Sequence, residues 1–154
     1  LAAAKEYVRL RIANNLREKG RIIFSTSLNA TRSEPVHTLY DSSKGAVSAL
    51  VRQLALELAK YGITTAGVAP GLVKTPLTDM GLESDPEAQK RIMEQIPTGE
   101  IATVKDVAEL YAFLGSNGAS YMTGQTVIID GGLDAQQMSS RPTSEGEKKI
   151  KEGA

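Results

Sequence analysis

The sequence contains no cysteine and a single histidine. Without cysteine the chain has neither a disulfide framework nor a thiolate metal site. One histidine, His37, is too few for a metal site built from imidazole ligands. We therefore expect no bound metal.

The chain also lacks an excess of charge of either sign and any long hydrophobic run. Eighteen basic and eighteen acidic side chains cancel, which argues against a surface for nucleic acid or for an anionic membrane. No apolar run approaches the roughly 20 residues that cross a bilayer. These absences predict a cytoplasmic protein that binds neither nucleic acid nor a membrane.

Apolar runs that alternate with amphipathic stretches predict the fold class. Runs typical of buried parallel strands lie at 21–27, 63–69 and 125–130. Helices are expected over 1–19, 39–61, 86–96 and 104–114. Gly20 is expected to end the first helix, and 28–38 is expected to form a loop. The alternation predicts an α/β protein, a three-layer doubly wound parallel sheet with helices on both faces.

Tyr40 and Lys44 stand four residues apart near the start of the helix expected over 39–61. This spacing places a phenol and an ammonium on one helix face. A phenol is a poor base near neutral pH because its ordinary pKa is about 10, and a cation one turn away favours the phenolate. The pair by itself is a weak motif, since an exposed Tyr and Lys occur at this spacing by chance.

Two further features strengthen the pattern. Ser27 stands thirteen residues before Tyr40, at the end of the apolar run RIIFSTS. The segment PGLVKT, residues 70–75, follows the next expected strand. The probability that all these features occur together by chance is small.

Together, Ser27, the Y-x-x-x-K pattern of Tyr40 and Lys44, and PGLVKT resemble the second half of a classical short-chain dehydrogenase/reductase. The similarity runs from about residue 21 to residue 133, and its last part is similar to both glucose dehydrogenases and 3-oxoacyl-carrier-protein reductases. The resemblance implies a Rossmann-like sheet. It also implies hydride transfer between the nicotinamide of NAD or NADP and a small-molecule alcohol or carbonyl substrate.

The resemblance implies a catalytic role for three residues. Tyr40 would be the general acid/base for the proton of the substrate oxygen. Lys44 would support Tyr40 and hydrogen-bond the nicotinamide ribose. Ser27 would hold the substrate oxygen as charge develops on it.

The same resemblance implies a set of cofactor-binding residues, which includes Tyr40 and Lys44 beside their catalytic roles. The nicotinamide ring and its carboxamide would be bound by Pro70, Gly71, the Val73 backbone and the Thr75 hydroxyl. Asn29 and His37 lie on the loop expected to face the substrate, although a lone loop histidine is more often structural than catalytic.

A glycine-rich turn that could hold a pyrophosphate is missing. The first glycine is Gly20, at the start of an expected strand. The residue by which the family selects NAD or NADP is also missing, and so is the Asn of its proton relay. Asn14 and Asn15 stand too close to the expected strand to be that Asn. We therefore expect 1–134 to be the C-terminal part of a Rossmann-like dehydrogenase domain without its N-terminal strands. Residues 135–154 are expected to form a disordered tail.

Two other interpretations remain open. Epimerases and dehydratases of the extended branch also carry Y-x-x-x-K, although their Ser or Thr stands much further before the Tyr. A non-catalytic interaction module that keeps the oligomerisation helices agrees with the missing phosphate turn.

The helix expected over 39–61 has apolar residues on both sides, which predicts that both sides are buried. Small outward-facing residues would let a partner helix approach closely. We therefore expect a homo-oligomer, either a dimer or a tetramer.

Overall fold

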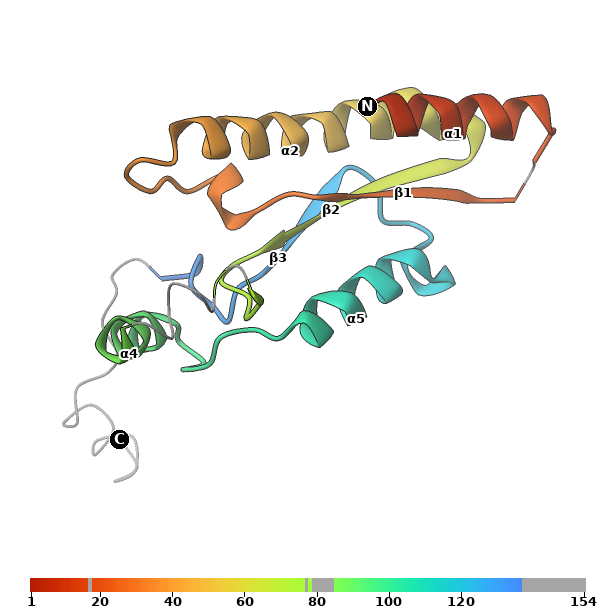
Figure 1. The fold of residues 1–154 in the computed structure, drawn as a ribbon. Helices are drawn as coiled ribbons and strands as arrows, with labels where there is room; N and C mark the ends of the chain where they lie inside the picture. Colours follow the sequence, from red (N-terminus) through yellow and green to blue (C-terminus); the bar gives the residue numbers. More distant parts are fainter. Residues whose placement is uncertain (17, 77, 79–84, 137–154) are drawn as a thin grey trace, which may run out of the picture. The chain divides into compact units, whose positions relative to one another are not determined.

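The computed structural model describes residues 1–16, 18–76, 78 and 85–136 of the 154-residue chain (Figure 1). The chain divides into two compact units. Unit 1 comprises Leu1–Pro70 and Lys105–Ile129, and unit 2 comprises Gly71–Val104 and Asp130–Ala154. Each unit is described by itself.

Unit 1 is built on a three-stranded parallel sheet with the order β1-β2-β3. The strands are β1 Gly20–Ser25, β2 Ile63–Pro70 and β3 Gln125–Ile129. Both strand pairs are parallel, so the carboxyl ends of the three strands point the same way. The predicted strands and the parallel α/β class are confirmed.

The helices of unit 1 cover both faces of this sheet. α1 Ala2–Ala13 and α2 Thr38–Leu58 lie on one face, and α5 Val104–Gly115 lies on the other (Figure 1). Three short 3-10 turns complete the unit: η1 Leu28–Ala30, η2 Ala59–Tyr61 and η3 Asn117–Ala119. The three-layer arrangement predicted from the alternating pattern is therefore present.

Two apolar clusters hold the layers together. On the α1 and α2 side, Leu54, Leu58 and Ile63 are buried and are packed by Tyr7, Val8, Ile22, Phe24 and Leu50. On the α5 side, Ala66, Val68, Leu114 and Ala119 are buried and are packed by partners that include Ile23, Val107, Leu110 and Val127. Consecutive residues of β1 thus point to opposite faces, as expected for a strand covered on both sides.

The first helix ends earlier than predicted, at Ala13 instead of Lys19. Asn15 adopts the left-handed conformation, with φ 49°. The Asn15 N–H donates to the Ile12 carbonyl and the Leu16 N–H donates to the Arg11 carbonyl, at 3.1 and 3.0 Å. This is the Schellman pattern, in which asparagine can replace the usual glycine. Gly20 was expected to end the helix, and it instead begins β1.

The first helix buries only some of its apolar side chains. Ala3 and Leu10 are exposed, whereas Ala4 is buried and Tyr7 is half-buried. The Arg11 guanidinium lies 5.6 Å from the centroid of the Tyr7 ring, so the long arginine side chain covers part of the same face.

Other boundaries differ by a few residues. The helix expected over 39–61 is α2 followed by η2. The loop expected over 28–38 contains η1, and its last residue, Thr38, already belongs to α2. The helix expected after Thr103 begins at Val104, as predicted.

Unit 2 contains α4 Pro86–Gln95, which confirms the amphipathic helix expected there. Ile96, directly after α4, is buried. The Asp130 carboxylate accepts hydrogen bonds from the N–H groups of Gly132 and Asp134 at 2.9 and 2.6 Å, which fixes the turn beyond β3. Residues 77 and 79–84, between the PGLVKT segment and α4, lie outside the described residues, as do 137–154 of the predicted tail.

Within the part of the chain that the structure describes, no helix combines the length and the apolar character needed to span a membrane.

Gly67 allows β2 to approach its neighbour closely. A Cβ at this position would lie 2.6 Å from Thr126 Oγ1 and 3.2 Å from Thr26 Cγ2. We predict that Gly67→Ala destabilises the protein by about 1–3 kcal/mol, the usual effect of overpacking a core. Denaturant unfolding of the variant and its parent measures the difference.

Gly115→Ala is the matched control. Nothing lies within 4 Å of a Cβ at Gly115, the last residue of α5. Alanine has a higher helix propensity than glycine, by up to about 1 kcal/mol, so this variant should be neutral or stabilising. Equal midpoints for Gly67→Ala and the parent would show that β2 and β3 are not packed this closely.

Candidate active site

Ser27 lies just beyond the carboxyl end of β1 and is the N-cap of η1. The Thr26 N–H donates to the Val68 carbonyl at 2.8 Å, so pairing with β2 continues to the residue before Ser27. Ser27 is 8% exposed, and its Oγ accepts a hydrogen bond from the Asn29 N–H at 3.2 Å. Because a hydroxyl is both donor and acceptor, this contact is compatible with donation of the Ser27 proton to a bound oxygen.

Tyr40 and Lys44 lie on the first turns of α2, as their spacing predicts. The Lys44 Nζ lies 5.5 Å from the centroid of the Tyr40 ring and donates to the Ser25 carbonyl at 3.2 Å. The lysine therefore joins the helix that carries Tyr40 to the strand that leads to Ser27. Tyr40 is 47% exposed, so its phenol is accessible to a ligand.

His37 contacts Tyr40 but has its own partner. Its Nδ1 lies 2.9 Å from Glu34 Oε2, and its ring centroid lies 6.1 Å from that of Tyr40 at an interplanar angle of 63°. Edge-to-face contact at this separation is a common aromatic arrangement. His37 thus lies beside the Tyr40 ring while bound to Glu34.

Asp41 is a polar residue of this region that sequence reasoning missed. Its Oδ1 accepts from Asn29 Nδ2 at 2.9 Å, and its Oδ2 accepts from the Glu34 N–H at 3.2 Å. An acidic residue in the first turn of a helix is common, and this ordinary explanation hid its role. The structure places Asn29, predicted to face the substrate, in contact with Asp41.

A second missed contact lies on the opposite face of the sheet. Ser25 Oγ and Tyr111 Oη are 2.5 Å apart, which joins the end of β1 to α5. Tyr111 stands at a helical spacing typical of core residues, so the sequence offered no signal for this hydroxyl contact. The last residue of β1 is thus held through its side chain by α5 and through its carbonyl by Lys44.

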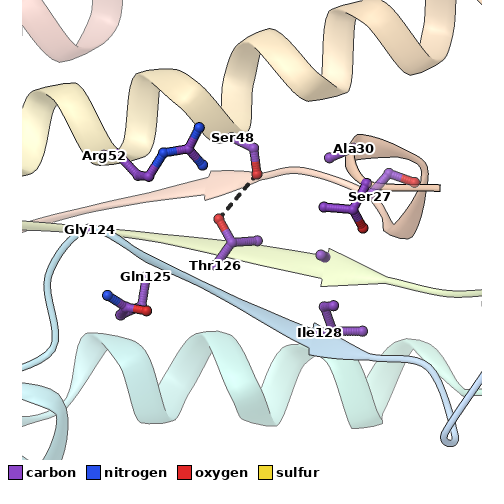
Figure 2. A pocket seen from close by; sticks show the side chains of 10 residues that line it. Ser27, Ala30, Ser48, Arg52, Gly124, Gln125, Thr126 and Ile128 are labelled. Atoms are coloured by element: carbon purple, nitrogen blue, oxygen red, sulfur yellow. Dashed lines mark hydrogen bonds between the residues drawn. The ribbon is translucent and has the colours of Figure 1, made fainter. Parts of the chain in front are cut away.

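A pocket of about 250 Å³ lies between α2 and β3 (Figure 2). Figure 2 shows Ser27 and Ala30 at one end of it and Arg52 and Gln125 at the other. A hydrogen bond of 3.2 Å between Ser48 and Thr126 crosses it. Its lining residues include neither Tyr40 nor Lys44, so we do not assign the reaction to it.

The predicted cofactor residues are divided between the two units. Pro70 is the last residue of β2 in unit 1, whereas Gly71, Val73 and Thr75 belong to unit 2. In unit 2, Val73 forms a parallel bridge with Ala102.

Thr75 closes a small hydrogen-bonded turn in unit 2. Its N–H donates to Thr78 Oγ1 at 2.9 Å, and the Thr78 N–H donates to Thr75 Oγ1 at 3.3 Å. Thr78 Oγ1 in turn donates to the Val73 carbonyl at 2.7 Å. The backbone of Val73 and the hydroxyl of Thr75 are therefore fixed relative to each other within unit 2.

The residues predicted to bind a nicotinamide dinucleotide offer suitable groups within each unit. In unit 1, Lys44 supplies an ammonium that can donate to a ribose. In unit 2, the Val73 backbone and the Thr75 hydroxyl supply groups that can pair with a carboxamide. The sequence contains no glycine-rich turn for a pyrophosphate. Among the described residues no three His, Asp or Glu side chains lie together as a metal site.

Comparison with known proteins shows which family has this arrangement. Residues 2–134 match the profile of the family described as Enoyl-(Acyl carrier protein) reductase. The chain belongs to the short-chain dehydrogenase/reductase family. This confirms the resemblance stated from Ser27, Tyr40, Lys44 and the PGLVKT segment.

Similar proteins of known name extend over most of this chain. The glucose 1-dehydrogenase of Gluconobacter oxydans is 38% identical over 84% of this chain and 47% of its own length. The 3-oxoacyl-[acyl-carrier-protein] reductase of Rickettsia prowazekii is 40% identical over 74% of this chain and 46% of its own length. The chain thus spans about half the length of these relatives.

A solved structure gives the same fold. A gluconate 5-dehydrogenase from Burkholderia cenocepacia, in complex with NADP and tartrate, superposes with a TM-score of 0.78 at 30% identity. The match covers 86% of this chain and 51% of that one. The Rossmann-like fold predicted from the sequence is confirmed.

We predict that these 154 residues alone do not bind a dinucleotide tightly, because they lack a turn for the pyrophosphate. Calorimetric titration with NADH and with NADPH measures this. Micromolar or tighter binding would show that another part of the chain holds the phosphates.

Proposed function

We propose that the protein is an NAD(P)-dependent oxidoreductase that interconverts an alcohol and a ketone or aldehyde. The observation that carries the proposal is the link made by Lys44, which lies by the Tyr40 ring and binds the Ser25 carbonyl, two residues before Ser27. Membership of a family of oxidoreductases supports it. The side chains of Tyr40, Lys44 and Ser27 are proposed to carry out the proton transfer and to bind the substrate oxygen.

Tyr40 is proposed to exchange a proton with the substrate oxygen. In the direction of ketone reduction its hydroxyl proton is donated as the oxygen gains charge, and in alcohol oxidation the phenolate takes the proton back. The Lys44 Nζ lies 5.5 Å from the centroid of the Tyr40 ring, which places a positive charge beside the group that exchanges the proton. Ser27 donates a second hydrogen bond to the same oxygen and so stabilises its developing charge.

A bound nicotinamide dinucleotide accepts or supplies the hydride. In this chain, Lys44 is proposed to bind its ribose, and Pro70, Gly71, Val73 and Thr75 are proposed to bind its nicotinamide end. The Val73 carbonyl accepts a hydrogen bond from Thr78 Oγ1, and the Val73 backbone is proposed to pair with the carboxamide. Either NAD or NADP is compatible with these residues.

Asn29 and His37 are proposed to border the substrate. Both are held by carboxylates, Asn29 by Asp41 and His37 by Glu34. The named relatives are a glucose dehydrogenase and a 3-oxoacyl-[acyl-carrier-protein] reductase, and the chemistry that they share is at an alcohol or carbonyl carbon. The substrate proposed for this protein is a small-molecule alcohol or carbonyl compound. A cytoplasmic location remains a prediction of the sequence.

We predict that Tyr40→Phe in the complete natural protein that carries this chain lowers turnover by about 10²–10⁴-fold. The variant keeps the ring and loses the transferable proton, so cofactor binding should stay nearly unchanged. Steady-state rates and a fluorescence titration with NADH or NADPH measure the two effects.

Tyr121→Phe is the matched control, because Tyr121 is 99% exposed and should tolerate the loss of its hydroxyl. Turnover by Tyr40→Phe within tenfold of the parent would remove Tyr40 from the proton-transfer step.

We also propose that the protein forms a dimer or tetramer through α2. Its inner side is buried at Val51, Leu54, Ala55 and Leu58. Its outer side carries the exposed residues Ala46, Ala49 and Leu56, of which Leu56 is 78% exposed, and the exposed Ala59 follows at the start of η2. A helix with apolar residues on both sides is suited to a second partner.

Ala49→Arg should lower the oligomeric state of the complete protein, because a large charged side chain prevents close helix approach. Light scattering measures the mass in solution. Ala49→Ser keeps a small side chain and should leave the mass unchanged. A parent that is monomeric, or an Ala49→Arg variant of unchanged mass, would exclude this helix from an interface.

A further inference from the structure

Asp41 lies in the first turn of α2, yet its carboxylate is bound to the preceding loop. Oδ1 accepts from Asn29 Nδ2 at 2.9 Å and Oδ2 accepts from the Glu34 N–H at 3.2 Å. Both partners precede the helix. Hydrogen bonds to an ionised carboxylate are stronger than those between neutral groups, so this contact is suited to holding a loop in place.

The two partners of Asp41, Asn29 and Glu34, connect it to Ser27 and Tyr40. These are the two residues proposed to bind the substrate oxygen. Through its backbone N–H, Asn29 also donates to Ser27 Oγ at 3.2 Å. Glu34 binds His37 through its carboxylate, and the His37 ring packs against the Tyr40 ring. Asp41 is itself the residue after Tyr40. One carboxylate thus joins the serine side and the tyrosine side of the site.

The loop 31–37, which lies between these contacts, needs hydrogen bonds from residues outside the loop to keep its conformation. Residues 31–37 are exposed, so little apolar burial stabilises their conformation. Val36 has φ 64°, an uncommon conformation for a β-branched residue. Such conformations persist only when the surrounding contacts impose them.

We propose that Asp41 is a positioning residue, whose carboxylate fixes the loop 28–37 on α2 and so sets the geometry of Ser27 relative to Tyr40. This inference rests on the proposed function, since it assigns Asp41 a role in the same reaction. Asp41 does not touch the reacting atoms. It acts through Asn29 on one side and through Glu34 on the other.

The test is an exchange of the two side chains in the complete natural protein that carries this chain. Asp41→Asn alone removes the charge from both hydrogen bonds, and its N–H₂ can pair with Asn29 only if the Asn29 amide turns over to present its oxygen. Asn29→Asp alone places two carboxylates in contact. In the double variant, the amide at position 41 donates to the carboxylate at position 29 and still accepts from the Glu34 N–H. The net charge of the double variant equals that of the parent.

Each single substitution should lower kcat by about ten- to a hundredfold, the effect expected when reacting groups are slightly misplaced. The KM for the nicotinamide cofactor should change little, because neither residue belongs to the proposed cofactor site. The double variant should recover to within about threefold of the parent, since contacting residues are strongly non-additive. Glu109→Gln, which removes a carboxylate from the exposed side of α5, should leave kcat unchanged.

Amide hydrogen exchange gives a second measurement that needs no activity. The Glu34 amide should exchange faster in Asp41→Asn than in the parent, and the double variant should restore its protection. Parent-like exchange in both single variants would show that the carboxylate does not hold the loop. Restored protection without recovered kcat would overturn the role in catalysis.

If the proposed function is wrong, the parent protein itself gives a different result in these experiments. A parent without NADH- or NADPH-dependent turnover on any alcohol or carbonyl compound would refute that function, and the positioning role with it. The exchange measurement would still decide whether Asp41 fixes the loop.

Discussion

The packing of α2 on the parallel sheet determines where the proposed catalytic residues of unit 1 lie. The buried stripe of α2 is anchored by Thr65 of β2, whose fully buried hydroxyl donates to the Val51 carbonyl at 2.8 Å. At the start of the helix, the Lys44 ammonium binds the Ser25 carbonyl of β1. The helix is therefore fixed to two neighbouring strands. If α2 rotated or slid, Tyr40 would move relative to Ser27. The apolar core and the proposed site therefore both depend on the packing of α2 on the sheet.

The sequence predicted the features that depend on periodicity. The three strands, α2 and α4 were found because burial on one or both faces leaves a regular apolar pattern. The spacing of Tyr40 and Lys44 predicted their adjacency on one face, since helix geometry is fixed. Ser27 was placed correctly at a strand end because the apolar run before it stops there.

The features that the sequence did not reveal depend on single side chains. The end of α1 rests on Asn15 in a left-handed conformation, and asparagine at this place carries a weaker signal than glycine. The contact between Ser25 and Tyr111 joins residues far apart in the chain, on a strand and a helix whose patterns indicate only burial. Asp41 has a common explanation as a first-turn acid, so only its contacts with Asn29 and Glu34 revealed another role.

The polar groups around Tyr40 are stabilised by other contacts than the apolar core beneath them. The side chains of Val51, Leu54 and Leu58 are apolar and buried. Glu34, His37 and Tyr40 are exposed and are ordered by contacts with one another. Ion pairs between exposed groups are individually weak, usually below about 1 kcal/mol. Asp41 is half-buried and accepts two hydrogen bonds from the loop, so it is the member of this group best shielded from water. A carboxylate in that position can order its neighbours because each of its oxygens accepts a hydrogen bond from the loop.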